Sequence, residues 1–473
     1  MTAALHPVWL IAKRELRDQL RDWRILTPLI ILTVGFPFLM NAFAYYAVEL
    51  TNQYGGDLIV DRLVPFSVLI IGFFPITISL LGALESFVGE KERGTIEPIL
   101  GSPLDDWQLY LGKLIVGIAG PLISSFTSIS IYLIVVSRQS LDMPSLEIFA
   151  QLFLLTIAHA LLMVSAAIVI SIQSTSVKAA NLMASFIIVP VTMLMMGETA
   201  LFIRLNNRVL WMAVLAVIIM AGLLVRLGLA HFQREYLLGR EIDVLNLRWI
   251  WRTFKTNFVG DATSLGMWYR VSVRATLRKL GKPIALLALL LVVGIAVAYL
   301  WSLDNLPGYL ASLDEQEMTK FQDRISSAGG MTSEVTALYL FAHNVQATLT
   351  IGFFGLFSFG VLGVILFVIN TSAIGGLFGF LKLQGFAILP LVLNGVLPHG
   401  IFEIPALILS CAAVLHVGLV LVTPNERSAI GEVLLEALAD WARVYVGLVV
   451  PLLAIAAVIE AYVTPLLLLN AMR

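Results

Sequence analysis

Long apolar runs constrain this chain more than any other feature of its sequence. A run of about 20 mostly apolar residues is long enough to cross the hydrocarbon core of a bilayer as an α-helix. Six such runs precede residue 230 and five follow residue 282. With 59% hydrophobic and only 13% charged residues, the composition excludes a soluble globular protein. We therefore predict an all-α, polytopic membrane protein with about eleven transmembrane helices, arranged as six and then five.

The connections between the predicted spans are short in the first half. The first-half spans are 25–48, 63–84, 109–136, 146–172, 180–203 and 209–229. The second-half spans are 283–301, 345–369, 373–397, 401–422 and 444–469. Residues 370–385 are rich in glycine and contain Lys382 and Gln384, so this stretch could instead be re-entrant. The pattern predicts a first domain at 1–230, a basic linker at 231–281 and a second membrane domain at 282–473.

Charge asymmetry predicts the orientation of the chain. Residues 226–282 hold eleven Lys/Arg against four Asp/Glu, whereas residues 302–343 hold two against six. Basic segments stay on the cytoplasmic side. We therefore expect a cytoplasmic N-terminus and linker, an outer acidic loop and an extracytoplasmic C-terminus. Aromatic residues among the basic ones could also indicate nucleic-acid binding, but beside a membrane we favour contact with anionic lipid and no nucleic acid.

Two amphipathic helices are predicted at the membrane surface. The apolar face of residues 7–24 carries Trp9, Leu16, Leu20 and Trp23, and the basic face carries Lys13, Arg14, Arg17, Arg21 and Arg24. Tryptophans beside a basic face are typical of a helix in the interface plane. Residues 424–443 form the second helix, on the cytoplasmic side. Membrane lipids are thus expected partners.

One polar stretch, GEKERGTIEPILGSP at 89–103, lies between the second and third predicted spans. Its charged residues are Glu90, Lys91, Glu92, Arg93 and Glu97. Lipid could not hold these charges, so the stretch must lie in water or against another protein. Gly94 breaks the charged run, and Thr95 can N-cap a segment in which Ile96, Ile99 and Leu100 share a helical face. The expected structure is a short amphipathic element docked on the membrane.

The order of these residues resembles the cytoplasmic loop of ABC-2 type exporter permeases. In that family Glu-Arg-Gly-Thr is followed by a Glu, a leucine-like pair and Ser/Thr-Pro. The corresponding residues here are Glu92, Arg93, Gly94, Thr95, Glu97, Ile99, Leu100, Ser102 and Pro103, and Gly112-Lys113 opens the next span as in the family. Pro98 and Gly101 depart from the pattern, so the helix after Thr95 is expected to be short or kinked.

The resemblance implies two contact sites for an ATPase. The coupling loop would comprise Glu90, Lys91, Glu92, Arg93, Gly94, Thr95 and Glu97, and the elbow helix would present Trp9, Arg14, Arg17, Leu20 and Trp23. Both Gly-Lys pairs, at 112 and 281, lack the Ser/Thr of a P-loop. The resemblance therefore implies a separate ABC ATPase that holds ATP and Mg²⁺, no cofactor on this chain, and a homodimer or paired permease in a bacterial inner membrane.

The second half carries its own polar set within apolar runs, namely Asn344, Asn370, His399, Glu403 and Glu460. A mid-span carboxylate costs about 3 kcal/mol, so the two glutamates should be paired, protonated or facing a polar cavity. His399 and Glu403 share a helix face because they are four residues apart. This pair could ligate a metal or relay a proton, but two ligands are an incomplete set and we expect no metal site. The structural alternative is that Glu403 locks helix packing through hydrogen bonds.

The run LPHGIFEIPALILSCAAVLHVG at 397–418 resembles the stage II sporulation protein M (SpoIIM) family, with His343-Asn344, Asn370 and IEAYVTP at 459–465 as further points of resemblance. The sequence departs from the family at His343, where a second Asn is common. The resemblance covers about residues 270–470 and implies a multi-spanning module that is tied, in sporulating bacteria, to a cell-wall-remodelling complex. Together the two resemblances favour the permease subunit of an ABC-type exporter with an unknown substrate. The alternatives are a non-transporting scaffold of a cell-envelope complex and, less favoured, a membrane-embedded hydrolase using His399, Glu403 and Glu460.

Overall fold

The computed structural model describes residues 2–54, 57–97, 101–139, 143–174, 176–183, 185–204, 207–232, 247–312, 337–423 and 430–471. Within these ranges the regular structure is helical and no strand occurs. Eleven of the described helical segments are long and apolar enough to cross a membrane, six of them before residue 231 and five after residue 280. The prediction of an all-α, polytopic membrane protein with six and then five spans is confirmed.

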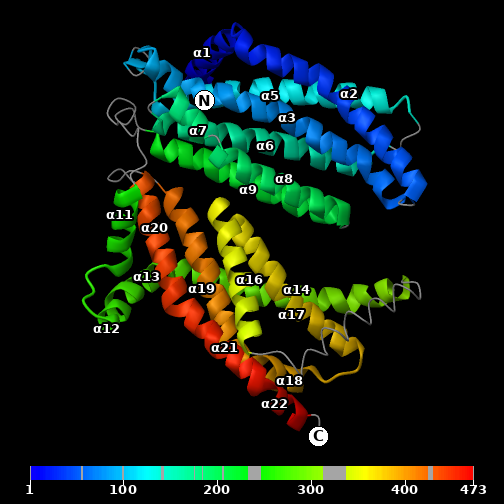
Figure 1. Cartoon of the computed structure of the whole chain (residues 1–473), viewed down its shortest axis with the longest axis vertical. Helices are drawn as coiled ribbons and strands as arrows, with labels where there is room; N and C mark the ends of the chain where they lie inside the picture. Colours follow the sequence, from blue (N-terminus) through cyan, green and yellow to red (C-terminus); the bar gives the residue numbers. More distant parts are fainter. Residues whose placement is uncertain are drawn as a thin grey trace. The chain divides into compact units, whose positions relative to one another are not determined.

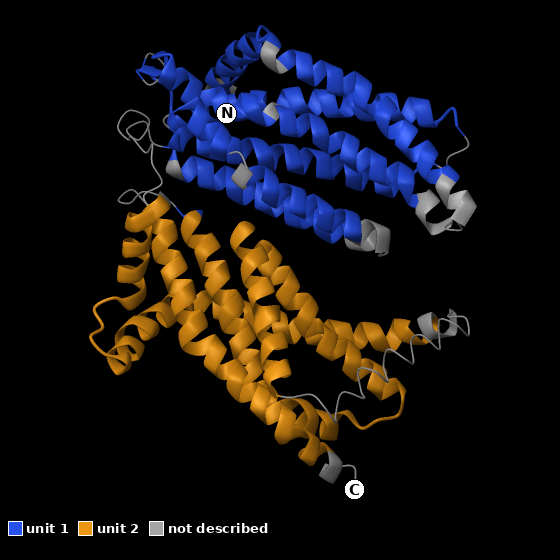
Figure 2. Ribbon diagram, viewed as in Figure 1, with its two compact units in different colours: residues 1–245, 422–426 blue, residues 246–421, 427–473 orange. Residues whose placement is uncertain are grey.

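The chain divides into two compact units (Figure 2). Unit 1 comprises residues 1–245 and 422–426, and unit 2 comprises residues 246–421 and 427–473. Each unit has its own long helices and its own buried apolar residues.

Unit 1 is a helical bundle built around α3 (Figure 1). Its described helices are α1 (Thr2–Gln19), α2 (Trp23–Tyr54), α3 (Asp57–Glu92), α5 (Asp106–Val136), α6 (Leu146–Gln173), α7 (Val177–Met183), α8 (Ser185–Arg204) and α9 (Asn207–His231). α3 packs against α2, α5 and α6, while α6 also packs against α9. Within the most apolar stretch of each span, 71% of the residues of α3 are buried, against 22% of those of α2. α3 is therefore the central helix, and α2 faces outward.

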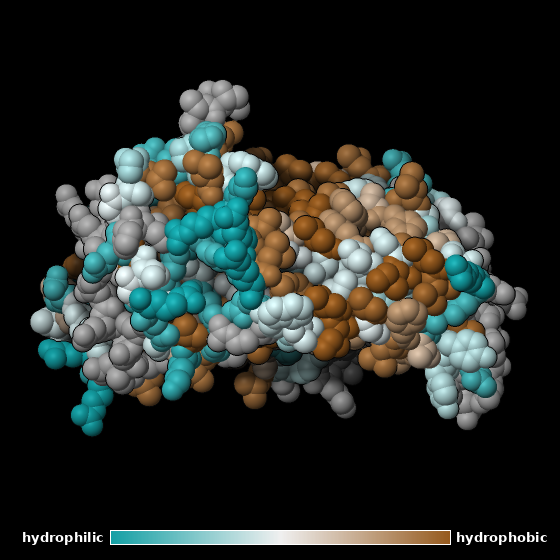
Figure 3. Space-filling view, turned by 90° about the horizontal axis from the view of Figure 1, so that it is seen from above, coloured by the Kyte–Doolittle hydropathy of each residue, from teal (hydrophilic) through white to brown (hydrophobic). Residues whose placement is uncertain are grey.

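The outward face of α2 is apolar over most of its length. Along its middle, Ile30, Ile31, Val34, Phe38, Leu39 and Phe43 are each at least half exposed. In Figure 3, hydrophobic residues form a broad band on the visible surface, with hydrophilic patches toward both ends. Such a surface is costly in water and stable in hydrocarbon, as expected of a membrane-spanning bundle.

α1 has the same length as the amphipathic helix predicted over residues 7–24 but lies five residues earlier in the chain. It ends at Gln19, Leu20 lies in a turn, and Trp23 begins α2. The chain reverses there because the N–H groups of Arg21 and Asp22 bond to carbonyls only three residues back. The tryptophans still point outward, with Trp9 66% and Trp23 71% exposed, so both can contact lipid headgroups.

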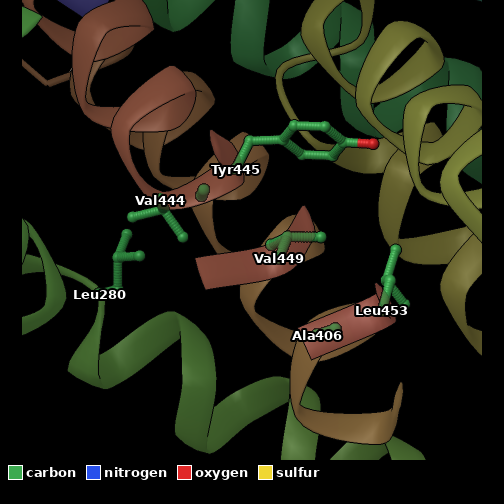
Figure 4. Close-up of a cluster of buried hydrophobic side chains, with 7 residues drawn as sticks. Leu280, Ala406, Val444, Tyr445, Val449 and Leu453 are labelled. Atoms are coloured by element: carbon green, nitrogen blue, oxygen red, sulfur yellow. The ribbon is translucent and has the colours of Figure 1, made fainter. Parts of the chain in front are cut away.

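Unit 2 packs its helices around α19. Its described elements are α11 (Leu247–Val259), α12 (Leu265–Met267), η1 (Trp268–Val273), α13 (Arg274–Lys279), α14 (Gly281–Ser312), α16 (Ala337–Phe357), α17 (Val361–Leu383), α18 (Ile388–Leu391), η3 (Val392–Val396), α19 (Leu397–Leu421), α20 (Ile430–Val444), η4 (Tyr445–Val449), α21 (Val450–Tyr462) and α22 (Thr464–Ala471). The three η elements are π-helical. α19 packs against α16, α20 and α21, and one of its core clusters joins Leu280, Ala406, Val444, Tyr445, Val449 and Leu453 (Figure 4).

The helix boundaries in unit 2 differ from the predicted spans. The predicted span 345–369 is crossed by a turn at 358–360, where Phe359 and Gly360 have φ of 54° and 92°. α16 therefore ends at Phe357, and α17 begins at Val361. Hydropathy missed this turn because apolar residues continue through it.

α17 is one continuous helix from Val361 to Leu383, so the re-entrant alternative for residues 370–385 is wrong. Its glycines permit close packing against α14. A Cβ at Gly375 would overlap the main chain of Ile295, and one at Gly379 would overlap Ser302. Small residues spaced by four let helices approach closely in lipid, which explains a glycine-rich sequence inside a span.

Two further predicted segments are more helical than the sequence suggested, and the predicted second interface helix is packed within unit 2. In the predicted linker, residues 247–281 form α11 to α13 and the start of α14 and belong to unit 2. The predicted acidic loop is helical at 302–312 and 337–343, and its residues 313–336 lie outside the described ranges. The predicted interface helix 424–443 begins, where described, at Ile430 and continues as α20 through η4 into α21. It is a packed helix, because Asp440 and Arg443 are 3% and 8% exposed.

Candidate functional site

The polar stretch after the second span begins as the last turn of α3. Gly94 has a φ of 66°, a left-handed conformation that suits glycine. Its N–H bonds to the carbonyl of Lys91 (3.1 Å), and the N–H of Thr95 bonds to the carbonyl of Glu90 (3.0 Å). These bonds satisfy carbonyls at the helix end in the manner of a C-terminal cap. The glycine of the Glu-Arg-Gly-Thr sequence therefore stops α3 and turns the chain.

Beneath this turn, four charged side chains from three helices form a cluster that we call the charge cluster: Arg14 and Glu15 of α1, Glu90 of α3 and Lys113 of α5. Lys113 Nζ lies 2.8 Å from Glu15 Oε1 and 3.0 Å from Glu90 Oε2. It also donates to the carbonyl of Ser86 (2.8 Å). Arg14 Nη2 lies 3.8 Å from Glu90 Oε1. The lysine is 3% exposed and Glu90 7%, so the cluster ties α1, α3 and α5 together inside the bundle.

The neighbouring residues of the stretch bind a second part of the bundle. Lys91 Nζ donates to the carbonyls of Ile172 (2.8 Å) and Ser174 (3.2 Å) at the C-terminal end of α6. Glu92 Oε1 accepts from the N–H of Val177 (2.8 Å), the first residue of α7. Both contacts match the polarity of helix ends, which favour cations at the C-terminus and anions at the N-terminus.

The expectation that the whole stretch faces water or a partner is therefore corrected. Glu90, Lys91 and Glu92 make contacts within unit 1. The sequence did not predict these contacts because the partners lie on other helices, and a hydropathy pattern does not show which helices pack together. Arg93, Gly94, Thr95 and Glu97 are exposed, while Ile96 is 5% exposed. Ile99 and Leu100 of the predicted apolar face lie outside the described residues. The exposed part of the predicted coupling loop is thus 92–95 and 97, and within it Glu92 also bonds to α7.

The predicted elbow helix, α1, lies against α5 beside the charge cluster. Its buried residues are Val8 and Ala12, and a Cβ at Gly112 would come within 2.8 Å of Ile11. Arg14 and Arg17 are exposed along α1, together with Trp9. The Gly112-Lys113 pair thus has a clear structural role, since the glycine admits α1 and the lysine binds its Glu15.

Sequence reasoning missed a buried pair between α6 and α8. His159 Nε2 lies 3.4 Å from Glu198 Oε1, and both side chains are 2% exposed. The Nδ1–H of His159 donates to the carbonyl of Leu155 (2.9 Å), so Nε2 is the nitrogen that faces the carboxylate. The two residues stand alone in separate apolar runs, and no sequence pattern connects them. Their attraction requires one shared proton, because a neutral imidazole and a carboxylate would otherwise present only acceptors.

In unit 2 the structure brings three of the predicted polar residues together. His399, Glu403 and Glu460 each place a ligand atom within 4.8 Å of the others. His399 Nε2 lies 4.0 Å from Glu403 Oε2, as expected for residues four apart on α19. Glu460 comes from α21, which packs against α19. All three are half-buried.

The other two predicted polar residues lie on different helices. Asn344 is half-buried on α16, where its main-chain carbonyl accepts from the hydroxyl of Thr348 (3.0 Å). Asn370 is exposed on α17.

A second ionic network in unit 2 was also missed. Asp440 of α20 accepts from Thr276 (2.7 Å), Lys279 (2.8 Å) and Arg443 (2.6 Å), and Arg443 also donates to the main-chain carbonyls of Asn257 and Phe258 at the end of α11. Burial alone would lower the pKa of Lys279, but its hydrogen bonds to Asp440 and Glu436 raise that pKa above its ordinary value. The network fastens α11 and α13 to α20.

The fold and these sites define a multi-pass membrane protein of two parts, the first with a capped polar turn on a central helix. Family comparisons agree with this division. Residues 6–197 match the ABC-2 type transporter family model, and residues 284–465 match that of stage II sporulation protein M. Both resemblances inferred from the sequence are confirmed.

Two curated relatives carry the same printed name, probable ABC transporter permease protein NosY. The protein from Pseudomonas aeruginosa is 33% identical over 109 residues, which are 23% of this chain and 38% of that protein. The protein from Stutzerimonas stutzeri is 32% identical over 112 residues, which are 24% of this chain and 38% of that protein. The similarity thus spans well under half of each relative.

Proposed function

We propose that this chain is the membrane-spanning permease subunit of an ABC-type exporter, driven by ATP that a separate ATPase subunit hydrolyses. The match to ABC-2 type transporters and the similarity to two proteins named as ABC transporter permeases support the class. In this proposal the chain works as a homodimer or paired permease in a bacterial inner membrane, with its N-terminus in the cytoplasm. It holds no nucleotide and hydrolyses none, since ATP and Mg²⁺ belong to the ATPase.

The single observation that carries the proposal is the charge cluster beneath an exposed turn. The turn ends α3, which is the most buried of the candidate spans in unit 1. Lys113 joins α3 to α1 and α5, while Lys91 and Glu92 join it to α6 and α7. A force applied at Arg93–Glu97 would therefore move several spans together. This is what a permease needs in order to convert closure of an ATPase into rearrangement of its membrane helices.

The test reverses charge only at the exposed residues. The double variant Arg93→Glu with Glu97→Lys keeps net charge and avoids the internal contacts of Glu92. We expect membrane insertion to be unchanged and recovery of an ABC ATPase in pull-downs from native membranes to fall by about tenfold or more, because like charges then face each other across the interface. The matched control is Arg138→Glu, an exposed reversal just beyond the other end of α5.

Wild-type recovery of the ATPase by the double variant would contradict the assignment of the coupling surface. Recovery of a peptidoglycan-modifying enzyme, and no ATPase, from wild-type membranes would favour the scaffold alternative over the exporter.

A further inference from the structure

The trio His399, Glu403 and Glu460 has an imbalance of hydrogen-bonding groups. Ionised carboxylates are acceptors only. Among the residues that the structure describes, neither Glu403 nor Glu460 forms an ion pair with a lysine or arginine, and the ion-pair partner of Glu403 is His399 itself. The trio therefore brings two acceptor groups together beside an imidazole.

The hydrogen bonds of Thr464 determine which nitrogen of that imidazole faces the carboxylates. The Thr464 hydroxyl donates to the carbonyl of Ile459 (3.3 Å). With its hydrogen directed at that carbonyl, the hydroxyl oxygen accepts from the Nδ1–H of His399, which lies 3.2 Å away. In the neutral ring this leaves Nε2 without a hydrogen, and its lone pair faces Glu403. All three groups of the trio then present lone pairs to one point.

We propose that His399, Glu403 and Glu460 bind a divalent transition-metal ion of the zinc class. One imidazole nitrogen and two carboxylate oxygens form a mixed set that suits such ions, and three protein ligands leave a fourth position open. The Thr464 hydroxyl takes the place of the carboxylate, carbonyl or water that usually accepts from the other nitrogen of a metal-bound histidine and fixes the orientation of the ring. The site belongs to unit 2 and is independent of the exporter assignment.

The geometry of the surrounding helices is compatible with this role. Around a tetrahedral zinc ion, ligand atoms lie about 3.4 Å apart, so the atoms now within 4.8 Å must close by about 1 Å. Rotation of the two long glutamate side chains covers that distance without main-chain movement. The π-helical segment η3 ends at Val396, three residues before His399, and such segments are frequent at functional sites.

The experiment uses full-length protein purified in detergent and stripped with a chelator, and zinc binding is measured by calorimetry and by metal analysis. We expect one zinc ion per chain, and a loss of affinity of about a hundredfold or more in Glu403→Gln, Glu460→Gln and His399→Ala. Thr464→Val should lose about tenfold, as is usual for residues that orient a ligand. Glu432→Gln, an exposed change in the same unit, should bind as wild type.

A gain-of-signal variant covers the case in which a substitution impairs folding. With cobalt(II) in place of zinc, Glu460→Cys should add a thiolate-to-metal charge-transfer band that wild type lacks. Native Cys411 is buried and outside the trio, so it serves as the internal blank. Absence of zinc binding in wild type would overturn the proposal, as would wild-type affinity in Glu403→Gln and Glu460→Gln or absence of the band in a folded Glu460→Cys protein.

Discussion

The charge cluster of unit 1 and the trio of unit 2 are both polar groups within membrane helices, but they differ in charge balance. In the charge cluster, Arg14 and Lys113 face two carboxylates, so positive and negative charges match across α1, α3 and α5. In the trio, two carboxylates lie beside one imidazole, and neither forms an ion pair with a lysine or arginine among the described residues. A balanced cluster stabilises the fold by itself. An unbalanced cluster needs a bound positive charge from outside the chain. This difference distinguishes a cluster that joins helices from one that binds a ligand.

The largest expected effect comes from breaking the balance of the charge cluster. Lys113→Met would leave the half-buried Glu15 and the buried Glu90 without the lysine, and only the exposed Arg14 would remain near Glu90. Removal of one partner of a buried ion pair typically costs about 3–5 kcal/mol, so we expect a large fall in the yield of folded protein and in its thermal midpoint in detergent. Adding Glu15→Gln and Glu90→Gln to Lys113→Met should restore much of the loss. Arg17→Met, an exposed change on the same α1, is the control.

When no metal is present, removal of the charges of the trio should have the opposite effect on thermal stability. Glu403→Leu with Glu460→Leu removes two like charges from an apolar region, so we expect equal or higher thermal stability than wild type in chelator. Added zinc at about 100 times its dissociation constant should stabilise wild type by about 2.7 kcal/mol and leave the double variant unchanged. A thermal-shift assay in detergent measures both effects. A double variant less stable than wild type in chelator would mean that the trio is a structural joint like the charge cluster.

Substitutions in the pair His159–Glu198 should have an effect of intermediate size. One shared proton between the imidazole and the carboxyl group balances donor and acceptor in this pair. His159→Leu should leave the Glu198 carboxyl buried without a partner, at a cost of about 1–3 kcal/mol. The double variant with Glu198→Leu should recover most of that loss. A double-mutant cycle measured by thermal unfolding gives the coupling energy, and strictly additive effects would show that the two side chains do not interact.

The sequence predicted features within one helix better than contacts between helices. A pattern along the chain shows which residues share a helix face, but it does not show which helices pack together. Hydropathy located the six spans of unit 1 but missed the turn before α17, since Phe359 is apolar and only its backbone conformation ends the helix. The helical repeat alone placed His399 beside Glu403. It could not add Glu460, whose place in the trio depends on the packing of α21 against α19. Burial of Glu90 was unpredictable for the same reason, because its partner Lys113 belongs to another helix.

The smallest expected effect concerns Lys279, a balanced but half-exposed partner of Asp440 and Glu436. Its pKa is raised above 10.5, so the protonated form is favoured by folding. The stabilisation from Lys279 is therefore fully present below pH 10.5 and declines as pH rises through the folded-state pKa. With 43% of the side chain exposed, solvent screening should keep the cost of Lys279→Met below about 1 kcal/mol at neutral pH. Unfolding of both proteins should be followed from pH 8 to about pH 11.5, where the difference should shrink. A difference that stays constant with pH would mean that the lysine acts through packing of its aliphatic stem and not through its charge.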